Sequence, residues 1–263
     1  MVNTWSKRNF FGPTDSGPHI YRDRNIGMSH AVGSEQGRTV LLVHGASHQG
    51  ASWRTLQTEL TALGIDSVTV DLPSASPDLA DLYADAAVIR SAVDALGPVT
   101  VVCHSYGGMP TTQALVGATN VERIVYLTAY MPAPGMTLID LVENDEDDTD
   151  WTIDNDETTI RAVDPRALFY NRCSQQVADD ALQDLSPHAL VSFTQPATVA
   201  AWQSAPSSYI VCTDDHAIPA SAQRRMAAQA DETFTIDSDH SPFLSAPVET
   251  AALLAGLIDR QRV

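Results

Sequence analysis

The sequence alternates between short apolar runs and longer stretches in which apolar residues recur every three or four positions. An apolar run without polar alternation is typical of a strand buried on both faces, and the longer stretches are typical of amphipathic helices. Strands of this kind joined by helices predict a parallel sheet with crossover helices on its faces. The expected strands lie at residues 39–45, 66–73, 97–105, 121–130, 208–215 and 233–237, and the expected helices at residues 52–63, 78–95, 109–116, 220–230 and 247–260.

The alternation is interrupted at residues 133–206, where acidic residues are followed by short helical pieces. A segment that follows one sheet strand and lets the sheet resume later is expected to cover the strand ends, where open α/β sheets bind their ligands. We therefore predict an α/β core at residues 38–132 and 207–263, with a mostly parallel central sheet flanked by helices. Residues 133–206 form a small helical cap in this scheme, and the polar residues 1–37 form an N-terminal arm.

Charge and hydropathy narrow the expected partners and location. The 263 residues carry 15 basic and 33 acidic side chains, a formal net charge of −18 at pH 7. Such a surface repels phosphate backbones and anionic lipids, so neither nucleic acid nor membrane is an expected partner. No stretch is apolar enough for a membrane span, and residues 1–19 lack the pattern of a secretory signal. Three cysteines cannot all pair, which favours reduced thiols in a cytoplasmic protein.

The strongest chemical signal is the motif CHSYGG at residues 103–108, which follows an apolar run directly and leads into an expected helix. We call it the nucleophile turn. A serine on such a strand-to-helix turn is held in a strained backbone conformation and needs small neighbours, because the flanking residues approach closely. The usual pattern is G-x-S-x-G, and here Cys103 replaces the first glycine. Ser105 is therefore the candidate nucleophile, and a chance serine that caps the next helix is the alternative.

A serine hydroxyl group is a weak nucleophile, so it needs a base that takes its proton and an acid that orients the base. His240 follows the last expected strand, where a loop residue can reach over the end of the sheet. Asp214 and Asp215 end the preceding strand, one helix and one strand before His240. The candidates thus occur in the order serine, aspartate, histidine, and the acid is one of the two adjacent aspartates.

Attack of a serine on a carbonyl carbon also needs two backbone N–H groups that bind the negative charge developing on the carbonyl oxygen. One is expected from Tyr106, directly after the nucleophile. The other is expected from Ala46, in the sequence HGA at residues 44–46, here called the oxyanion turn. Gly45 lets the backbone of this turn come close to the substrate. A plain turn at the end of a strand is the alternative interpretation.

Together, the segments VLLVHGASHQGASW, CHSYGG, VCTDDHAIP and DHSPF resemble the α/β-hydrolase superfamily. The resemblance runs from about Thr39 to the C-terminus. It is greatest to the branch that contains plant methylesterases, polyneuridine-aldehyde-type esterases, hydroxynitrile lyases and many bacterial carboxylesterases. In that branch the triad acid stands four residues before a proline, which implies Asp215, before Pro219. The resemblance implies an esterase with the triad Ser105, Asp215 and His240 and with no metal or organic cofactor.

Two other functions occur on this fold, since fold alone does not determine chemistry. Hydroxynitrile lyases of this branch typically carry threonine at the position of Gly45, and a lysine directly after the catalytic histidine to stabilise departing cyanide. This chain has Ser241 there. A ligand receptor would keep the fold and turn over esters slowly or not at all, which the complete triad disfavours. Dehalogenases and epoxide hydrolases of similar shape use an aspartate nucleophile, and Ser105 argues against both.

The expected substrate is a small-molecule carboxylic ester, or a lactone or amide. Aromatic residues of the cap are the candidates for its pocket: Trp151 and Phe169 first, then Tyr170, Phe193 and Trp202. Such residues also pack against one another in a core, so each has a structural alternative. The acidic run at residues 143–157 would disfavour anionic substrates if it faced the site, and is otherwise a solvated surface. A homodimer is compatible with this interpretation.

Overall fold

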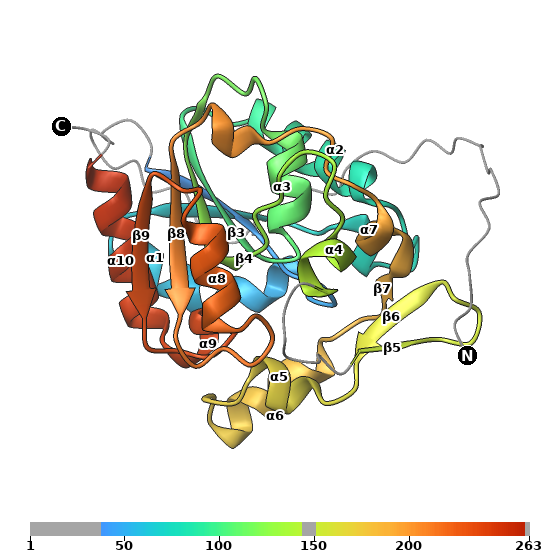
Figure 1. Cartoon of the computed structure of the whole chain (residues 1–263). Helices are drawn as coiled ribbons and strands as arrows, with labels where there is room; N and C mark the ends of the chain where they lie inside the picture. The colour runs from blue at the N-terminus through green and yellow to red at the C-terminus, as the bar shows by residue number, and fades with distance from the viewer. Residues whose placement is uncertain (1–37, 144–150, 261–263) are drawn as a thin grey trace.

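The computed structural model describes residues 38–143 and 151–260. The expected N-terminal arm and the centre of the acidic run lie outside the described residues. The core of the fold is a six-stranded parallel sheet with the strand order β2-β1-β3-β4-β8-β9 (Figure 1). Its strands are β1 Thr39–Val43, β2 Asp66–Val70, β3 Val99–Ser105, β4 Val121–Ala129, β8 Ser207–Cys212 and β9 Glu232–Ile236. The predicted fold class, an α/β protein with a mostly parallel central sheet, is confirmed.

Helices cover both faces of this sheet (Figure 1). They are α1 Arg54–Ala62, α2 Leu82–Asp94, α3 Gly108–Ala114, α8 Ala220–Ala227, α9 Pro242–Ser245 and α10 Pro247–Asp259. Leu41 and Val43 of β1 join the apolar core on the side of α2, α3 and α8, whereas Val40 and Leu42 join the core on the side of α1 and α10. Because side chains alternate along a strand, a strand that is apolar throughout is buried on both faces.

The strand order reverses between β1 and β3, and this reversal places two turns side by side. The chain runs from β1 outward to β2 and then returns to β3 on the other side of β1. Strands β1 and β3 are parallel, with Val43 opposite Cys103. The oxyanion turn and the nucleophile turn therefore leave the same edge of the sheet from adjacent strands. This is the crevice in which α/β sheets bind their ligands.

Between β4 and β8 the chain forms short helices and a second, three-stranded antiparallel sheet with the order β5-β6-β7. The helices are α4 Leu138–Glu143, α5 Pro165–Phe169, α6 Gln175–Gln183 and α7 Leu190–Thr194, and the strands are β5 Trp151–Ile153, β6 Thr159–Ala162 and β7 His188–Ala189. Helices α5 and α6 fall on the short helical pieces expected at residues 165–170 and 176–185. The small sheet is additional to the expected helical cap. Its strands are two to four residues long, too short for a recognisable alternation.

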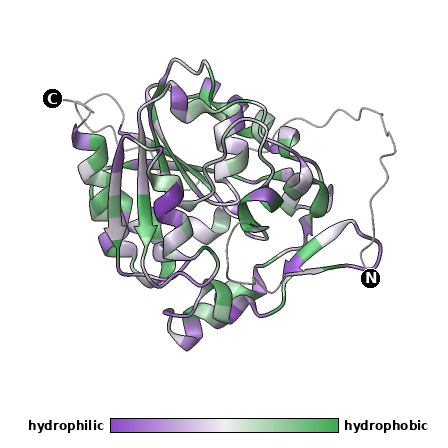
Figure 2. Cartoon of the chain, viewed as in Figure 1, coloured by the Kyte–Doolittle hydropathy of each residue, from purple (hydrophilic) through white to green (hydrophobic). Residues whose placement is uncertain are grey.

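Hydropathy follows the layers of the fold. Figure 2 shows apolar residues at the carboxyl end of β8, a strand that is buried along its whole length. Within residues 38–143 and 151–260, no helix is long and apolar enough to cross a membrane.

The three cysteines are free thiols: Cys103 and Cys212 are buried and Cys173 is half-buried. Short 3₁₀ helices lie at η1 Gly50–Trp53, η2 Pro73–Ala75 and η3 Ala201–Gln203.

Candidate active site

Ser105 stands at the carboxyl end of β3, on the strained turn that the sequence predicts. Its φ angle of 52° lies in the left-handed region, which a residue with a side chain rarely adopts. Small neighbours are required here because a Cβ atom on Gly107 would lie 2.4 Å from the carbonyl oxygen of His44. On Gly108 it would lie 2.0 Å from the carbonyl oxygen of Tyr130. Helix α3 begins at Gly108, so the chain turns from strand to helix within three residues.

The structure brings His240 and Asp215 together. His240 lies in the loop between β9 and α9, and its Nδ1 atom is 2.8 Å from Oδ2 of Asp215. Both side chains are almost fully buried. A ring that donates from Nδ1 to a carboxylate keeps Nε2 as the atom that can accept a proton. Nδ1 donation to Asp215 thus prepares His240 to act as a base.

The two adjacent aspartates have different surroundings. Asp215 is buried, and its Oδ1 accepts hydrogen bonds from the backbone N–H groups of Ala217 at 2.7 Å and Ile218 at 2.9 Å. The Asp214 side chain is 49% exposed and lies 3.8 Å from the guanidinium group of Arg172. Of the two aspartates, Asp215 is therefore the one that contacts His240.

Two further residues hold Asp215, and the sequence analysis does not identify either. The hydroxyl group of Thr128 and the amide of Gln223 both donate to Oδ2 of Asp215, the latter at 3.1 Å. Thr128 has a φ angle of 37° at the end of β4, and Gln223 is fixed by bonds to the backbone of Cys212 and Ile218. These contacts cross between separate elements, and no local sequence signal marks them.

The oxyanion turn and the nucleophile turn are in close contact. A Cβ atom on Gly45 would lie 2.8 Å from Cβ of Ser105, so only glycine lets the two backbones approach this closely. Ala46 and Tyr106 line the same cavity as Ser105. No described residue accepts a hydrogen bond from the backbone N–H group of Ala46 or Tyr106. Both amides are thus free to bind an oxygen atom of a substrate.

The other histidines near the site are buried. Nε2 of His104 lies 2.7 Å from the carbonyl oxygen of His240 and so anchors the loop that carries the candidate base. His48 bonds the carbonyl oxygen of Ala46 through Nδ1, at 2.7 Å. Burial lowers the pKa of His48 and of His188 to about 3, so both rings are neutral at physiological pH.

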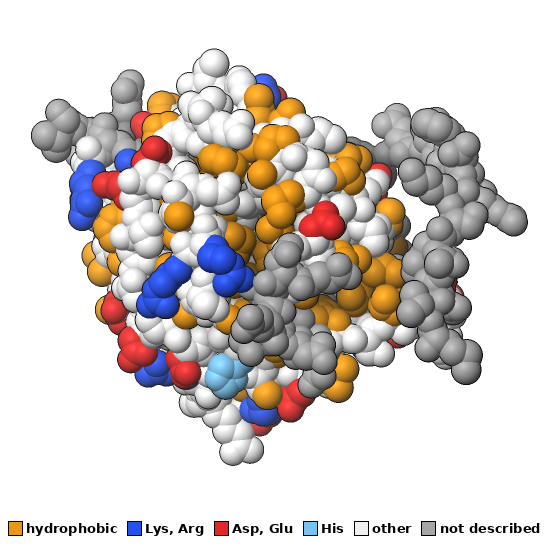
Figure 3. Space-filling view, in the orientation of Figure 1, with side chains coloured by type: hydrophobic (Ala, Val, Ile, Leu, Met, Phe, Trp, Pro, Cys, Tyr) orange, Lys and Arg blue, Asp and Glu red, His pale blue; other side chains and the backbone are white. Residues whose placement is uncertain are grey.

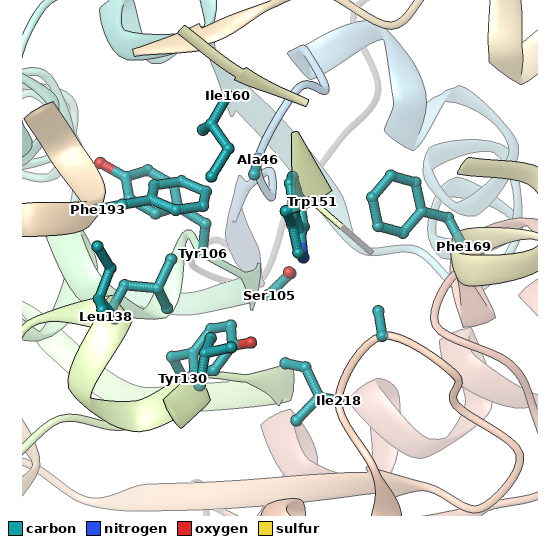
Figure 4. Close-up of a pocket in the computed structure, with 13 residues that line it drawn as sticks. Ala46, Ser105, Tyr106, Tyr130, Leu138, Trp151, Ile160, Phe169, Phe193 and Ile218 are labelled. Atoms are coloured by element: carbon teal, nitrogen blue, oxygen red, sulfur yellow. The ribbon is translucent and has the colours of Figure 1, made fainter. Parts of the chain in front are cut away.

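A cavity of about 150 Å³ opens at Ser105, and Figure 4 shows Ser105 between Tyr106 and Phe193 on one side and Phe169 on the other. Trp151, Phe169 and Phe193, three of the aromatic candidates for a substrate pocket, line it. Tyr170 and Trp202 do not: the Tyr170 hydroxyl group is 2.8 Å from Nε2 of His48, and the Trp202 indole donates to a backbone carbonyl. No charged residue is among the described residues that line this cavity, which are Ala46, Ser105, Tyr106, Tyr130, Leu138, Ile139, Val142, Trp151, Ile160, Phe169, Phe193, Ala217 and Ile218.

Described apolar side chains also lie on the surface beside the cavity. Figure 3 shows apolar side chains gathered on the face that carries α4, whose residues Leu138, Ile139 and Val142 line the cavity. Across the described ranges, no group of three or more His, Cys, Asp or Glu side chains is arranged to hold a metal ion.

Comparison with known proteins agrees with this geometry. Residues 40–253 match the model of the alpha/beta hydrolase family. The alpha/beta hydrolase nvfD of Aspergillus novofumigatus is 30% identical over 229 residues, which cover 79% of this chain and 91% of that protein. The chain belongs to the alpha/beta hydrolase family.

Other similar proteins include plant methylesterases. The pFDCC methylesterase MES16 of Arabidopsis thaliana is 29% identical over 260 residues, which cover 86% of this chain and 97% of the relative. The crystal structure of MES16 superposes with a TM-score of 0.73 at 25% identity and covers 84% of this chain and 99% of that chain. A pyrethroid hydrolase from Sphingobium faniae JZ-2 has the same fold, with a TM-score of 0.74 at 22% identity over 84% of this chain and 97% of that chain.

Proposed function

We propose that this α/β hydrolase is a serine esterase that cleaves a carboxylic ester through an acyl-enzyme intermediate. The observation that carries the proposal is the buried hydrogen bond between His240 and Asp215, in a fold that also places Ser105 on a strained turn facing an apolar cavity. The plant methylesterases among the similar proteins support an ester as the substrate.

The residues at the site account for each step of the reaction. Ser105 Oγ attacks the carbonyl carbon while His240 takes its proton, and Asp215 stabilises the resulting imidazolium. The N–H groups of Ala46 and Tyr106 bind the negatively charged oxygen of the tetrahedral intermediate. This intermediate collapses when the C–O bond to the alcohol breaks and His240 returns the proton to the leaving oxygen. Water then attacks the acyl-enzyme by the same route and releases the acid and free Ser105.

The lining of the cavity favours an uncharged, apolar substrate. Aromatic and aliphatic side chains surround Ser105, and an anionic group placed among them would lose its hydration without gaining a cation. We therefore infer that the acyl or alcohol part bound there is neutral and apolar. This holds for an ester, and equally for a lactone or an amide of the same character.

A hydroxynitrile lyase is the alternative with the same triad, and the site gives it no specific support. Such an enzyme needs a cation beside the catalytic histidine to hold departing cyanide. Here the following residue is Ser241, which is fully buried. We expect no release of cyanide from mandelonitrile above the uncatalysed rate.

A panel of p-nitrophenyl esters of graded chain length, with small methyl esters and lactones, tests the proposed activity. The sharpest comparison is p-nitrophenyl butyrate against p-nitrophenyl hemisuccinate, since the acyl chains match in length and differ in charge. We expect the butyrate to have the higher kcat/KM. Cyanide release that depends on Ser105, in the absence of any ester hydrolysis, would contradict the proposed function. A preference for the hemisuccinate would contradict only the inferred substrate class.

A further inference from the structure

A buried carboxylate lies behind the nucleophile turn, and the reaction described above does not use it. Asp85 is on the inner face of α2 and is fully buried. Its Oδ1 accepts the backbone N–H group of Ser74 at 2.9 Å. Its Oδ2 accepts two hydroxyl groups, those of Ser74 at 2.5 Å and Tyr106 at 2.6 Å. Three donors thus converge on one side chain.

Tyr106 connects this carboxylate to the active site. Its hydroxyl end is bound to Asp85, while its backbone N–H group is one of the two proposed oxyanion donors. The ring between these two ends packs against two neighbouring rings: its centroid lies 4.5 Å from that of His188 and 5.5 Å from that of Phe193, which stacks on it (Figure 4). A residue held at its ring, its hydroxyl group and its turn has little freedom to rotate.

The charges around Asp85 do not favour an ionised carboxylate. Burial raises the pKa of Asp85 to about 7. The charge of Asp81, the N-cap residue of α2, also raises this pKa, whereas the hydrogen bonds from Ser74 and Tyr106 lower it. His188, which packs against the Tyr106 ring, is neutral because burial lowers its pKa. No described Lys or Arg side chain forms an ion pair with Asp85. A buried carboxyl group without a cation costs stability, so a purely structural role explains it poorly.

We propose that Asp85 is a positioning residue of the oxyanion hole, which acts through the hydroxyl group of Tyr106. The inference rests on the proposed function, since it assigns a task to the Tyr106 amide. An ionised Asp85 accepts both hydroxyl groups at Oδ2. A protonated Asp85 must itself donate one hydrogen bond, so one of the three present contacts is lost or reversed. The amide of Tyr106 is therefore held best when Asp85 is ionised.

The test compares Tyr106→Phe, Asp85→Asn and the double variant in steady-state hydrolysis of a p-nitrophenyl ester. Tyr126→Phe is the matched control, because the Tyr126 hydroxyl group is also buried and bonds Thr112 at 2.7 Å, outside the cavity lining. Displacement of an oxyanion donor acts on the transition state, so we expect each single variant to lower kcat by about 10- to 100-fold with little change in KM. The double variant should lose no more than the single variants, and the control should keep wild-type kcat.

The pH profile of kcat gives a second readout that a merely structural role would not change. Beyond any ionisation that all three proteins share, the wild type should show an ionisation near neutral pH that is missing in both Asp85→Asn and Tyr106→Phe. Unchanged kcat in Tyr106→Phe, or losses that multiply in the double variant, would overturn the proposal. If Asp85→Asn does not fold, Tyr106→Phe alone decides, since it keeps the ring and its packing. Absence of ester hydrolysis in the wild type would contradict the proposed esterase function. The results for the variants, by contrast, test only the positioning role of Asp85.

Discussion

Single residues in this site differ sharply in role even when they are neighbours in the sequence. Asp214 and Asp215 follow the same strand, yet one is half-exposed beside Arg172 and the other is buried against His240. The difference follows from the backbone, since the turn after β8 directs the N–H groups of Ala217 and Ile218 at Asp215. Donors fixed by the backbone thus hold the Asp215 side chain in place.

The same contrast gives a prediction for the triad acid. Asp215→Asn should lower kcat by about 10⁴-fold, because the amide oxygen stays with the N–H groups of Ala217 and Ile218 and the amide NH2 group then faces Nδ1, so that the histidine adopts the wrong tautomer. Asp214→Asn makes the same change from carboxylate to amide at the neighbouring aspartate, and it should leave kcat close to that of the wild type. Steady-state kinetics of the two purified variants checks this. A large loss in Asp214→Asn with a small one in Asp215→Asn would contradict the assignment.

Asp85 leads to a prediction about stability and pH. Burial raises the pKa of this carboxyl group from 3.8 to about 7, so the folded protein holds the proton more tightly than the unfolded chain does. The stabilisation from the bound proton is complete below about pH 4 and is lost as the pH rises through about 7. The Asp85→Asn variant cannot ionise at this position. The Tm of the variant minus the Tm of the wild type should therefore be larger at pH 8 than at pH 5.

Thermal unfolding of both proteins at the two pH values measures this difference. Asp94→Asn is the control, because Asp94 lies at the exposed end of the same helix, paired with Arg90. Its Tm difference from the wild type should change little between the two pH values. A Tm difference for Asp85→Asn that is equal at pH 5 and pH 8 would show that Asp85 does not titrate in this range.

At the scale of secondary structure elements, the sheet and its helices could be predicted from the sequence. Strands that are apolar throughout and helices with one apolar face give signals confined to neighbouring residues. The helix expected at residues 78–95 begins four residues later, at Leu82, because the Asp81 side chain caps it by accepting the N–H group of Ala84. The small sheet of the cap could not be predicted, since its strands are too short to carry a pattern.

The candidate site also contains residues that could be predicted from the sequence and residues that could not. Ser105 and His240 follow from motifs, because a strained turn and a loop after the last strand have local sequence signatures. Thr128, Gln223 and Asp85 do not. Each acts across elements, as in the bond between Thr128 and Asp215, 87 residues apart, and such contacts exist only in the folded chain.

Two glycines in helices provide a matched pair at this scale. A Cβ atom on Gly108 would overlap the backbone of Tyr130, so Gly108→Ala should destabilise the protein by about 1–3 kcal/mol and displace the nucleophile turn. Gly256 lies on the exposed side of α10, where an added Cβ atom would meet open space, so Gly256→Ala should stabilise by about 0.5–1 kcal/mol. Urea unfolding of both variants measures these changes. Equal effects would mean that the nucleophile turn can accommodate a side chain.

At the scale of the whole molecule, the cavity at Ser105 lies where the core and the segment between β4 and β8 meet. The core supplies Ser105, Ala46 and Tyr106 from adjacent strands, and the inserted segment supplies Trp151 and Phe193 as a wall of the cavity. The two parts are joined by hydrogen bonds, including one from the backbone N–H group of Ser186 to the carbonyl oxygen of Ser47 at 2.9 Å. In the proposed esterase, specificity and reactivity thus come from different stretches of the chain.

The central claim is that Ser105 is the nucleophile, and covalent labelling tests it most directly. Wild-type protein and Ser105→Ala are treated with a fluorophosphonate probe, and the labelled residue is located by mass spectrometry. We predict a label on Ser105 in the wild type, none in the variant, and a loss of ester hydrolysis of up to about 10⁶-fold with the Tm preserved. A label on another serine that persists in Ser105→Ala, together with retained hydrolysis, would contradict the account.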